Sequence, residues 1–234
     1  MREMTMYVLS PCNLNCEECI MMKFMKKHRS YQMSLPEIEA FLDISSKSDY
    51  VFRFILSGGE PLLWKNLKAG VQLLRGSPVC GGIDMFSNAV NINKVDDDVM
   101  ECIDELRLSL YGNNRKNAEC LIKRYGKKIR VVDRTTFWVN PTSAIEGTLP
   151  AKCLNYHQHM YMDYKVYACP HSGSIAEGNG SKTPIYTPLA PGFLEKVDAI
   201  FESQQPEICT FCISNKNVRD KVETVSNSKG ISLL

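Results

Sequence analysis

Short apolar runs alternate with longer segments of helical periodicity, and this alternation is the strongest constraint on the fold. The apolar runs cover residues 5–9, 51–56, 83–86, 108–110 and 129–139. The helical patterns between them cover residues 34–46, 62–74, 96–106 and 116–125. Strands that alternate with helices in this way are typical of βα units, in which right-handed crossovers join parallel strands. The sequence therefore predicts an α/β chain with a parallel sheet.

The number of predicted strands limits how that sheet can close. Five strands are too few for a full barrel, which needs eight. We therefore expect an open, partial βα barrel, with its chemistry at the carboxyl ends of the strands. After residue 140 the alternation stops, and cysteine pairs, turns and one predicted helix over residues 193–203 follow. These features predict a core domain over residues 1–145 and a small cysteine-rich module over residues 146–234.

The ten cysteines could form disulfides or bind metal, and the composition of the chain helps to choose between these roles. The chain has 44% hydrophobic and 23% charged residues, as globular proteins do, and its net charge of +2 is too small to indicate a nucleic-acid partner. It has neither an apolar run long enough to cross a membrane nor the apolar core of a signal peptide. We therefore expect a cytoplasmic protein without a membrane partner. Cysteines in that compartment favour metal ligation over disulfides.

Three cysteines directly follow the first predicted strand, in the spacing CxxxCxxC: Cys12, Cys16 and Cys19. A tight loop can direct three thiolates onto one iron-sulfur centre. Because a cubane has four irons, three protein ligands would leave one iron open to another molecule. The alternative is a structural zinc loop with a distant fourth ligand.

The second predicted strand ends in a glycine turn, formed by Gly58, Gly59, Glu60 and Pro61. Glycines let the backbone approach a ligand closely, and a carbonyl or carboxylate there can accept hydrogen bonds from an ammonium group. The alternative is an ordinary strand-to-helix turn.

Taken together, the cysteine loop and the glycine turn resemble the radical S-adenosylmethionine (radical SAM) superfamily over residues 5–140. The resemblance implies that Cys12, Cys16 and Cys19 hold a 4Fe-4S cluster. It also implies that residues 58–61 contact the methionine amino group of bound S-adenosylmethionine. In this superfamily an electron from the cluster cleaves the cofactor, and the resulting 5'-deoxyadenosyl radical abstracts a substrate hydrogen. The electron would come from an external donor such as flavodoxin or ferredoxin.

Two further positions match the superfamily pattern, and one departs from it. The turn containing Asn88 follows the third predicted strand, where the superfamily often has Thr-Asn-Gly. Ser109 ends the fourth, where members often bind polar groups of the cofactor. Either residue could instead serve only as a turn former or a strand end. Glu18 stands where an aromatic residue is usual, so adenine packing must differ.

The C-terminal segment carries a second group of four cysteines: Cys153, Cys169, Cys209 and Cys212. Their order, and the predicted hairpin over residues 163–170, resemble the twitch module, a shortened relative of the SPASM module. This resemblance implies an auxiliary 4Fe-4S cluster with all four irons ligated, and therefore a role in electron transfer. Structural zinc and unliganded cysteines are the alternatives.

The expected function is that of a radical SAM oxidoreductase acting on a small polar molecule such as a sugar, cyclitol or nucleotide derivative. One alternative is a peptide maturase that works with a partner protein on a peptide or protein substrate. Another is a non-catalytic metal-binding adaptor. The base that an oxidation needs stays unassigned among seven residues: Glu18, Lys23, His157, His159, Tyr161, Asp163 and His171.

Overall fold

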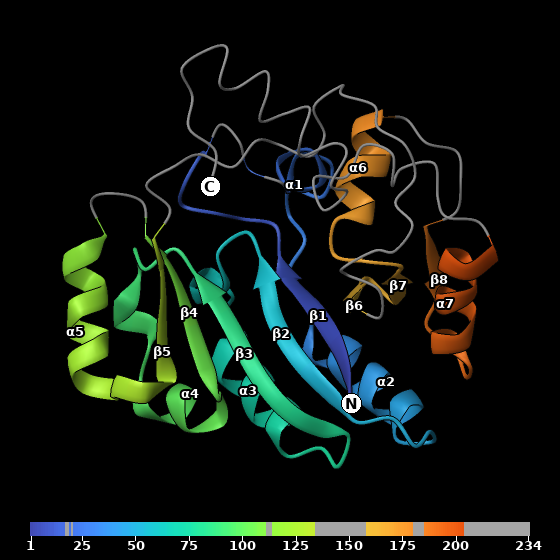
Figure 1. Cartoon of the computed structure of the whole chain (residues 1–234), viewed down its shortest axis with the longest axis horizontal. Helices are drawn as coiled ribbons and strands as arrows, with labels where there is room; N and C mark the ends of the chain where they lie inside the picture. Colours follow the sequence, from blue (N-terminus) through green and yellow to red (C-terminus); the bar gives the residue numbers. More distant parts are fainter. Residues whose placement is uncertain (17–18, 20, 111–113, 134–157, 180–184, 204–234) are drawn as a thin grey trace.

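A single sheet of eight strands organises the computed structural model, which describes residues 1–16, 19, 21–110, 114–133, 158–179 and 185–203 (Figure 1). The strand order is β5-β4-β3-β2-β1-β6-β7-β8, and the sheet is open. All pairings among β1 to β6 are parallel, whereas β7 and β8 are antiparallel additions. This confirms the predicted open α/β architecture. The strands are β1 (Arg2–Leu9), β2 (Phe52–Gly58), β3 (Cys80–Ser87), β4 (Glu105–Leu110), β5 (Ile129–Asp133), β6 (Gln158–Met162), β7 (Lys165–Tyr167) and β8 (Tyr186–Pro188).

Helices connect successive parallel strands as crossovers. The first residues of α2 show how local sequence sets where a helix begins. The Ser34 hydroxyl accepts a hydrogen bond from Glu37 N, and Glu37 Oε2 accepts one from Ser34 N at 2.8 Å. This is the capping box that begins α2. The helices are α1 (Met22–Lys27), α2 (Leu35–Ser45), α3 (Leu67–Arg75), α4 (Asp97–Cys102), α5 (Arg115–Tyr125), α6 (Ser172–Asn179) and α7 (Phe193–Ser203), with short 3-10 turns η1 (Pro61–Leu63), η2 (Ile92–Lys94) and η3 (Gly126–Lys128).

Two predicted helices are too long. The helical pattern over residues 62–74 forms an α-helix only from Leu67, because Trp64, which follows the short η1 turn, has extended backbone angles. The expected helix over residues 96–106 ends at Cys102, and β4 begins at Glu105 instead of residue 108. Ile103 already has extended backbone angles, and Leu106 and Leu108 alternate with polar residues in the strand period. The apolar residues of β4 therefore belong to a half-buried strand.

The sheet extends beyond the first five strands. β6 pairs with the free edge of β1, and a hairpin then turns into β7 through Asp163 and Tyr164, whose φ angles are 50° and 55°. Positive φ angles at both central residues are typical of the tight turns that close two-residue hairpins. The boundary near residue 145 lies outside the described residues and stays a prediction.

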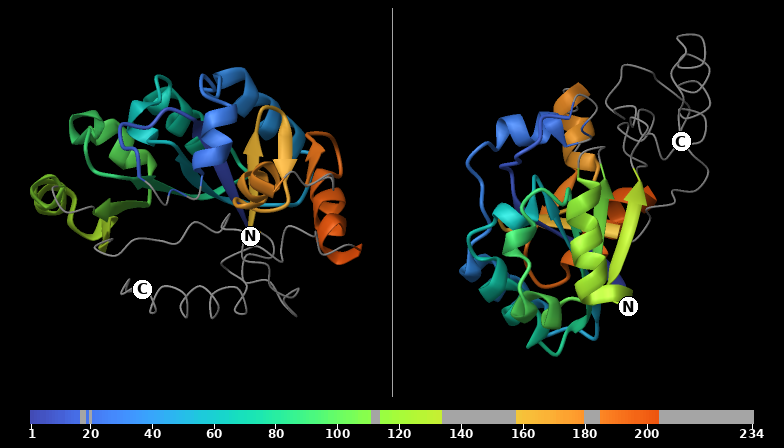
Figure 2. Two further views of the ribbon diagram at one scale, coloured as in Figure 1. Left: turned by 90° about the horizontal axis from the view of Figure 1, so that it is seen from above. Right: turned by 90° about the vertical axis from the view of Figure 1, so that its left-hand side faces the viewer.

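The two faces of the sheet carry separate hydrophobic cores. On one face, α2, α3, α4 and α5 cover the large apolar core that includes Met4, Phe54 and Leu56. On the other face, α1 and α6 lie beside one another and cover a smaller core that includes Tyr7 and Phe24 (Figure 2). The smaller core covers β1, β6 and β7. None of the described helices is both long and apolar enough to cross a membrane.

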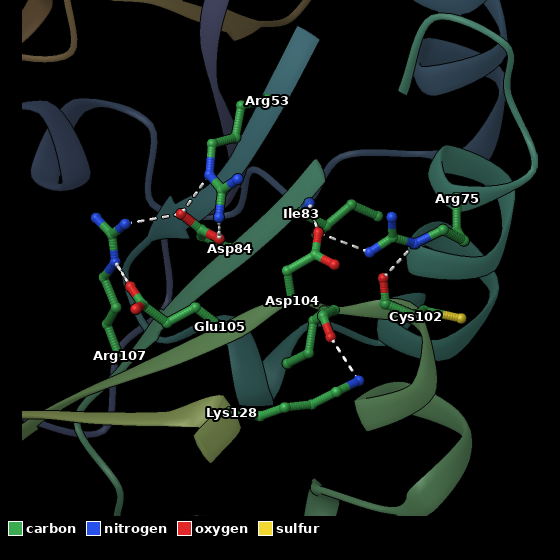
Figure 3. Close-up of polar contacts among 10 residues, drawn as sticks. Arg53, Arg75, Ile83, Asp84, Cys102, Asp104, Glu105, Arg107 and Lys128 are labelled. Atoms are coloured by element: carbon green, nitrogen blue, oxygen red, sulfur yellow. Dashed lines mark hydrogen bonds and ion pairs between the residues drawn. The ribbon is translucent and has the colours of Figure 1, made fainter. Parts of the chain in front are cut away.

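The sheet face on which Tyr7 lies continues across β2, β3 and β4, where it carries charged side chains in place of an apolar core (Figure 3). The Asp84 side chain is fully buried and accepts hydrogen bonds from Arg53 Nε and Nη2 at 2.9 and 2.6 Å. It also accepts one from Arg107 Nη2 at 2.7 Å, and Arg107 pairs with Glu105. Because the two guanidinium groups come from β2 and β4, the Asp84 carboxylate on β3 ties three strands together.

Candidate cofactor and cluster site

The loops after the neighbouring strands β1, β2 and β3 meet at the carboxyl edge of the sheet, as parallel strands require. They carry the cysteine loop, the glycine turn and Asn88, respectively. Hydrogen bonds join these three predicted elements directly. Ser109, the second-to-last residue of β4, is half-buried and is not among the residues that these contacts join.

The glycine turn packs backbone to backbone against the start of the cysteine loop. Gly59 N donates to Leu9 O at 2.7 Å, and Glu60 N donates to Pro11 O at 3.0 Å. A Cβ on Gly59 would lie 2.1 Å from Pro11 O, and one on Gly58 would lie 2.3 Å from Leu9 O. Gly58 also has a φ of 142°, which favours glycine. Both glycines are therefore required by the close approach of the two loops.

Glu60 fixes the end of β3. Its side chain is almost fully buried, with Oε1 accepting from Ser87 Oγ at 2.8 Å and from Leu62 N at 3.0 Å. Oε2 accepts from Asn88 N at 2.8 Å. Burial raises the pKa of the carboxyl group, and these hydrogen bonds oppose the rise. The contact with a methionine amino group that we expect for Glu60 stays a prediction.

We expect Glu60→Gln to cost about 1–3 kcal/mol of stability, because an amide cannot accept from all three donors without turning its NH2 group toward one of them. Thermal unfolding measures this loss. Glu119→Gln on the exposed face of α5 is the control and should change stability by less than about 0.5 kcal/mol. Equal unfolding temperatures for the two variants would contradict the assigned role of Glu60.

Asn88 connects this turn to the cysteine loop. Its Nδ2 donates to Asn13 Oδ1 at 2.7 Å and lies 3.8 Å from Cys12 Sγ. The next residue, Ala89, has a φ of 57°, a conformation that glycine adopts more easily. This explains why Ser-Asn-Ala can form the turn that the superfamily often builds from Thr-Asn-Gly.

Two residues that sequence reasoning missed hold the same turn from the start of α5. Asn114, which directly precedes α5, donates from Nδ2 to Asn88 O at 2.7 Å, and Asn117 in the first turn donates from Nδ2 to Ala89 O at 2.9 Å. Because residues three apart lie on one side of a helix, both amides can reach the same turn. This spacing was the available signal.

The thiols of the first loop fit a site for a positively charged cluster. Cys12, Cys16 and Cys19 are half-buried, and none forms a disulfide. Burial raises the pKa of Cys12, and the negative charges of Glu60, Cys19 and Cys16 raise it further. Burial also raises the pKa of Cys16. Three nearby thiolates are therefore unfavourable without a cation, and iron would supply the compensating charge.

Among the residues that the structure describes, no three metal-ligating side chains are gathered closely enough to hold one metal ion.

Of the second cysteine group, only Cys169 lies within the described residues. Cys169 is buried, forms no disulfide, and follows the β6–β7 hairpin as predicted. Cys153, Cys209 and Cys212 lie outside the described residues, and their role as ligands stays a prediction.

Two of the candidate bases have structural contacts. Tyr161 is buried, and its hydroxyl donates to Glu37 O at 2.9 Å. His159 is also buried: Nδ1 lies 3.1 Å from Ala168 O, and Nε2 lies 3.1 Å from Asp198 Oδ1. Both side chains therefore join β6 to neighbouring elements.

The remaining candidate bases are less constrained. Asp163 lies at the hairpin tip and pairs with Lys165 at 2.6 Å. Burial lowers the pKa of His171 to about 4. Glu18, His157 and the Lys23 side chain lie outside the described residues.

Comparison with solved structures identifies the class to which this fold belongs. The crystal structure of BtrN in complex with AdoMet and 2-DOIA matches with a TM-score of 0.64 and 15% identity, covering 94% of this chain and 89% of that chain. The structure of selenomethionine BtrN in an open conformation matches with a TM-score of 0.53 and 14% identity, covering 94% and 88%. At these identities the likeness establishes the fold alone. No curated protein sequence matches.

The family assignment comes from the sequence. The family described as a 4Fe-4S single cluster domain matches residues 1–120, just over half of the chain. The chain belongs to this family, and its fold and motifs confirm the predicted membership of the radical SAM superfamily. The matched region contains the cysteine loop, the glycine turn and Asn88.

Proposed function

We propose that this radical SAM enzyme oxidises a small polar molecule and carries two 4Fe-4S clusters. The observation that carries the proposal is the convergence of Cys12, Gly59 and Asn88 at one edge of the sheet. The AdoMet and the small molecule 2-DOIA bound by BtrN support a cofactor and a substrate of these classes. Sugars, cyclitols and nucleotide derivatives are the expected substrates.

The residues of the chain have separate roles in this proposal. Cys12, Cys16 and Cys19 hold the first cluster and leave one iron open. Residues 58–61 contact the methionine part of S-adenosylmethionine, and Asn88 and Ser109 contact its other polar groups. When bound and reduced by an external donor such as flavodoxin or ferredoxin, the cluster and cofactor together supply a 5'-deoxyadenosyl radical.

The proposed reaction removes two electrons and two protons from the substrate. One hydrogen atom goes to 5'-deoxyadenosyl, one electron to the auxiliary cluster, and one proton to a base. Cys153, Cys169, Cys209 and Cys212 would fill every iron of the auxiliary cluster, so that it accepts an electron without binding the substrate.

Metal analysis after anaerobic reconstitution tests the two-cluster proposal. Two cubanes give about eight irons per chain, whereas one cubane with a structural zinc gives about four irons and one zinc. We expect about eight. Four irons with one zinc would rule out the auxiliary cluster, and zinc without iron would indicate a metal-binding adaptor instead of an enzyme.

A further inference from the structure

Strand register places three side chains in one row across β3, β4 and β5. Phe86 pairs with Arg107, and Arg107 pairs with Arg130. Paired residues of neighbouring strands point to the same face, as do residues two apart in one strand, so this row shares its face with Asp84. Phe86 is two residues, or about 7 Å of extended chain, from Asn88, which contacts the cysteine loop. The row therefore lies close to the carboxyl edge of the sheet.

The guanidinium group of Arg107 is fixed from below and from one side. Its Nη2 donates to Asp84 Oδ2 at 2.7 Å, and its Nε pairs with Glu105. Its Cζ lies 5.3 Å from the centre of the half-buried Phe86 ring, and 25% of the side chain is exposed. Among the described residues, Nη1 has no hydrogen-bond partner. Arg107 therefore presents a fixed cation with N–H groups left to bind a ligand.

Arg130 adds a second positive charge beside the first. It is exposed on β5, and no ion pair or hydrogen bond joins its side chain to another described residue. Its Cα lies about 4.8 Å from that of Arg107, because neighbouring strands have this spacing. The carboxylates of Asp84 and Glu105 lie one row nearer the amino ends of the strands. Like charges in register are unfavourable, and an anion bound between the two arginines would relieve their repulsion.

We propose that the substrate of this enzyme carries a phosphate group and that Arg107 and Arg130 bind it. This inference rests on the proposed function and narrows its substrate class to phosphorylated small molecules. A phosphate suits the row because its two negative charges and three terminal oxygens can use both guanidinium groups, whereas one guanidinium satisfies a carboxylate. The contacts of Arg107 with Asp84 and Glu105 set its geometry before binding, which reduces the entropy lost when the ligand binds.

The test is a phosphorus-31 NMR titration of inorganic phosphate with the anaerobically reconstituted full chain, at constant ionic strength. Arg130→Gln removes the exposed cation of the row, and Arg130→Lys keeps the charge without the guanidinium group. Arg124→Gln is the matched control, because it removes the same charge from an exposed arginine of α5 that lies outside the row. Acetate is added as a competitor to test whether the site prefers a carboxylate.

We expect Arg130→Gln to raise the dissociation constant of phosphate about tenfold, since a hydrogen bond to a charged group contributes about 1.5–3 kcal/mol and tenfold corresponds to about 1.4 kcal/mol. Arg130→Lys should recover part of this loss, and Arg124→Gln should bind phosphate as the wild type does. Equal constants for the wild type and Arg130→Gln would overturn the inference and leave the proposed function standing. Displacement of phosphate by an equal concentration of acetate would also overturn it.

Formation of 5'-deoxyadenosine by the same preparations tests the proposed function separately. A reconstituted protein that binds phosphate through Arg130 and forms no 5'-deoxyadenosine would overturn the proposed function, and with it the assignment of the phosphate to a radical SAM substrate.

Discussion

Replacing Cys16 by alanine is expected to abolish cleavage of S-adenosylmethionine. With Cys16 removed, the first loop retains two of the three thiolates that the cubane requires from it, and the cluster should be lost or unstable. The variant should lack the iron of the first cluster after reconstitution and form 5'-deoxyadenosine only at background level. Iron content and 5'-deoxyadenosine, measured on the same anaerobic sample, check this prediction.

Cys120→Ala is the matched control, because this cysteine is exposed on α5 and belongs to neither cysteine group. It should keep both the iron and the cleavage activity of the wild type. If Cys16→Ala retained activity comparable with Cys120→Ala, the assignment of the first loop as the cluster site would be wrong.

Gly59→Ala is expected to cost about 3 kcal/mol of stability and to prevent cofactor binding. The added Cβ would lie 2.1 Å from Pro11 O and 2.4 Å from Ser10 O, both backbone atoms of the cysteine loop. Overpacking typically costs about 1–3 kcal/mol, and the upper end applies because no side-chain rotation relieves this clash. The unfolding temperature should fall by about 6–12 °C, since a chain of this size loses about 2–4 °C for each kcal/mol.

Gly76→Ala provides the control for an added methyl group. Gly76 has a φ of −71°, and its Cβ would meet no atom closer than 3.4 Å. We expect a stability change below about 0.5 kcal/mol and normal cofactor binding. If Gly59→Ala unfolded at the same temperature as Gly76→Ala, the cysteine loop could not be packed against the glycine turn as described.

The elements that the sequence predicts well are those whose signal is local. Ser34 and Glu37 mark the start of α2 because a capping box involves only four residues. The cysteine loop and the glycine turn could be placed together because parallel strands end at one edge. Local patterns were misleading at Leu106, where a short apolar segment fits either a helix or a strand.

Other features depend on contacts between distant residues, which sequence patterns do not report. The pairing of β6 with β1 joins segments about 155 residues apart. The buried position of Glu60 depends on Ser87 and Asn88, and the contacts of His159 depend on Asp198. For this reason the sequence suggests Glu60 as a ligand contact and His159 as a base, without indicating that each makes structural bonds.

We propose that Cys12, Cys16 and Cys19 form the site of a cluster that cleaves S-adenosylmethionine. The most direct measurement is 5'-deoxyadenosine formation by the anaerobically reconstituted full chain, reduced with dithionite and supplied with S-adenosylmethionine. We predict that 5'-deoxyadenosine and methionine form in equal amounts. A reconstituted protein that binds its iron-sulfur cluster and S-adenosylmethionine yet never produces 5'-deoxyadenosine would contradict the claim.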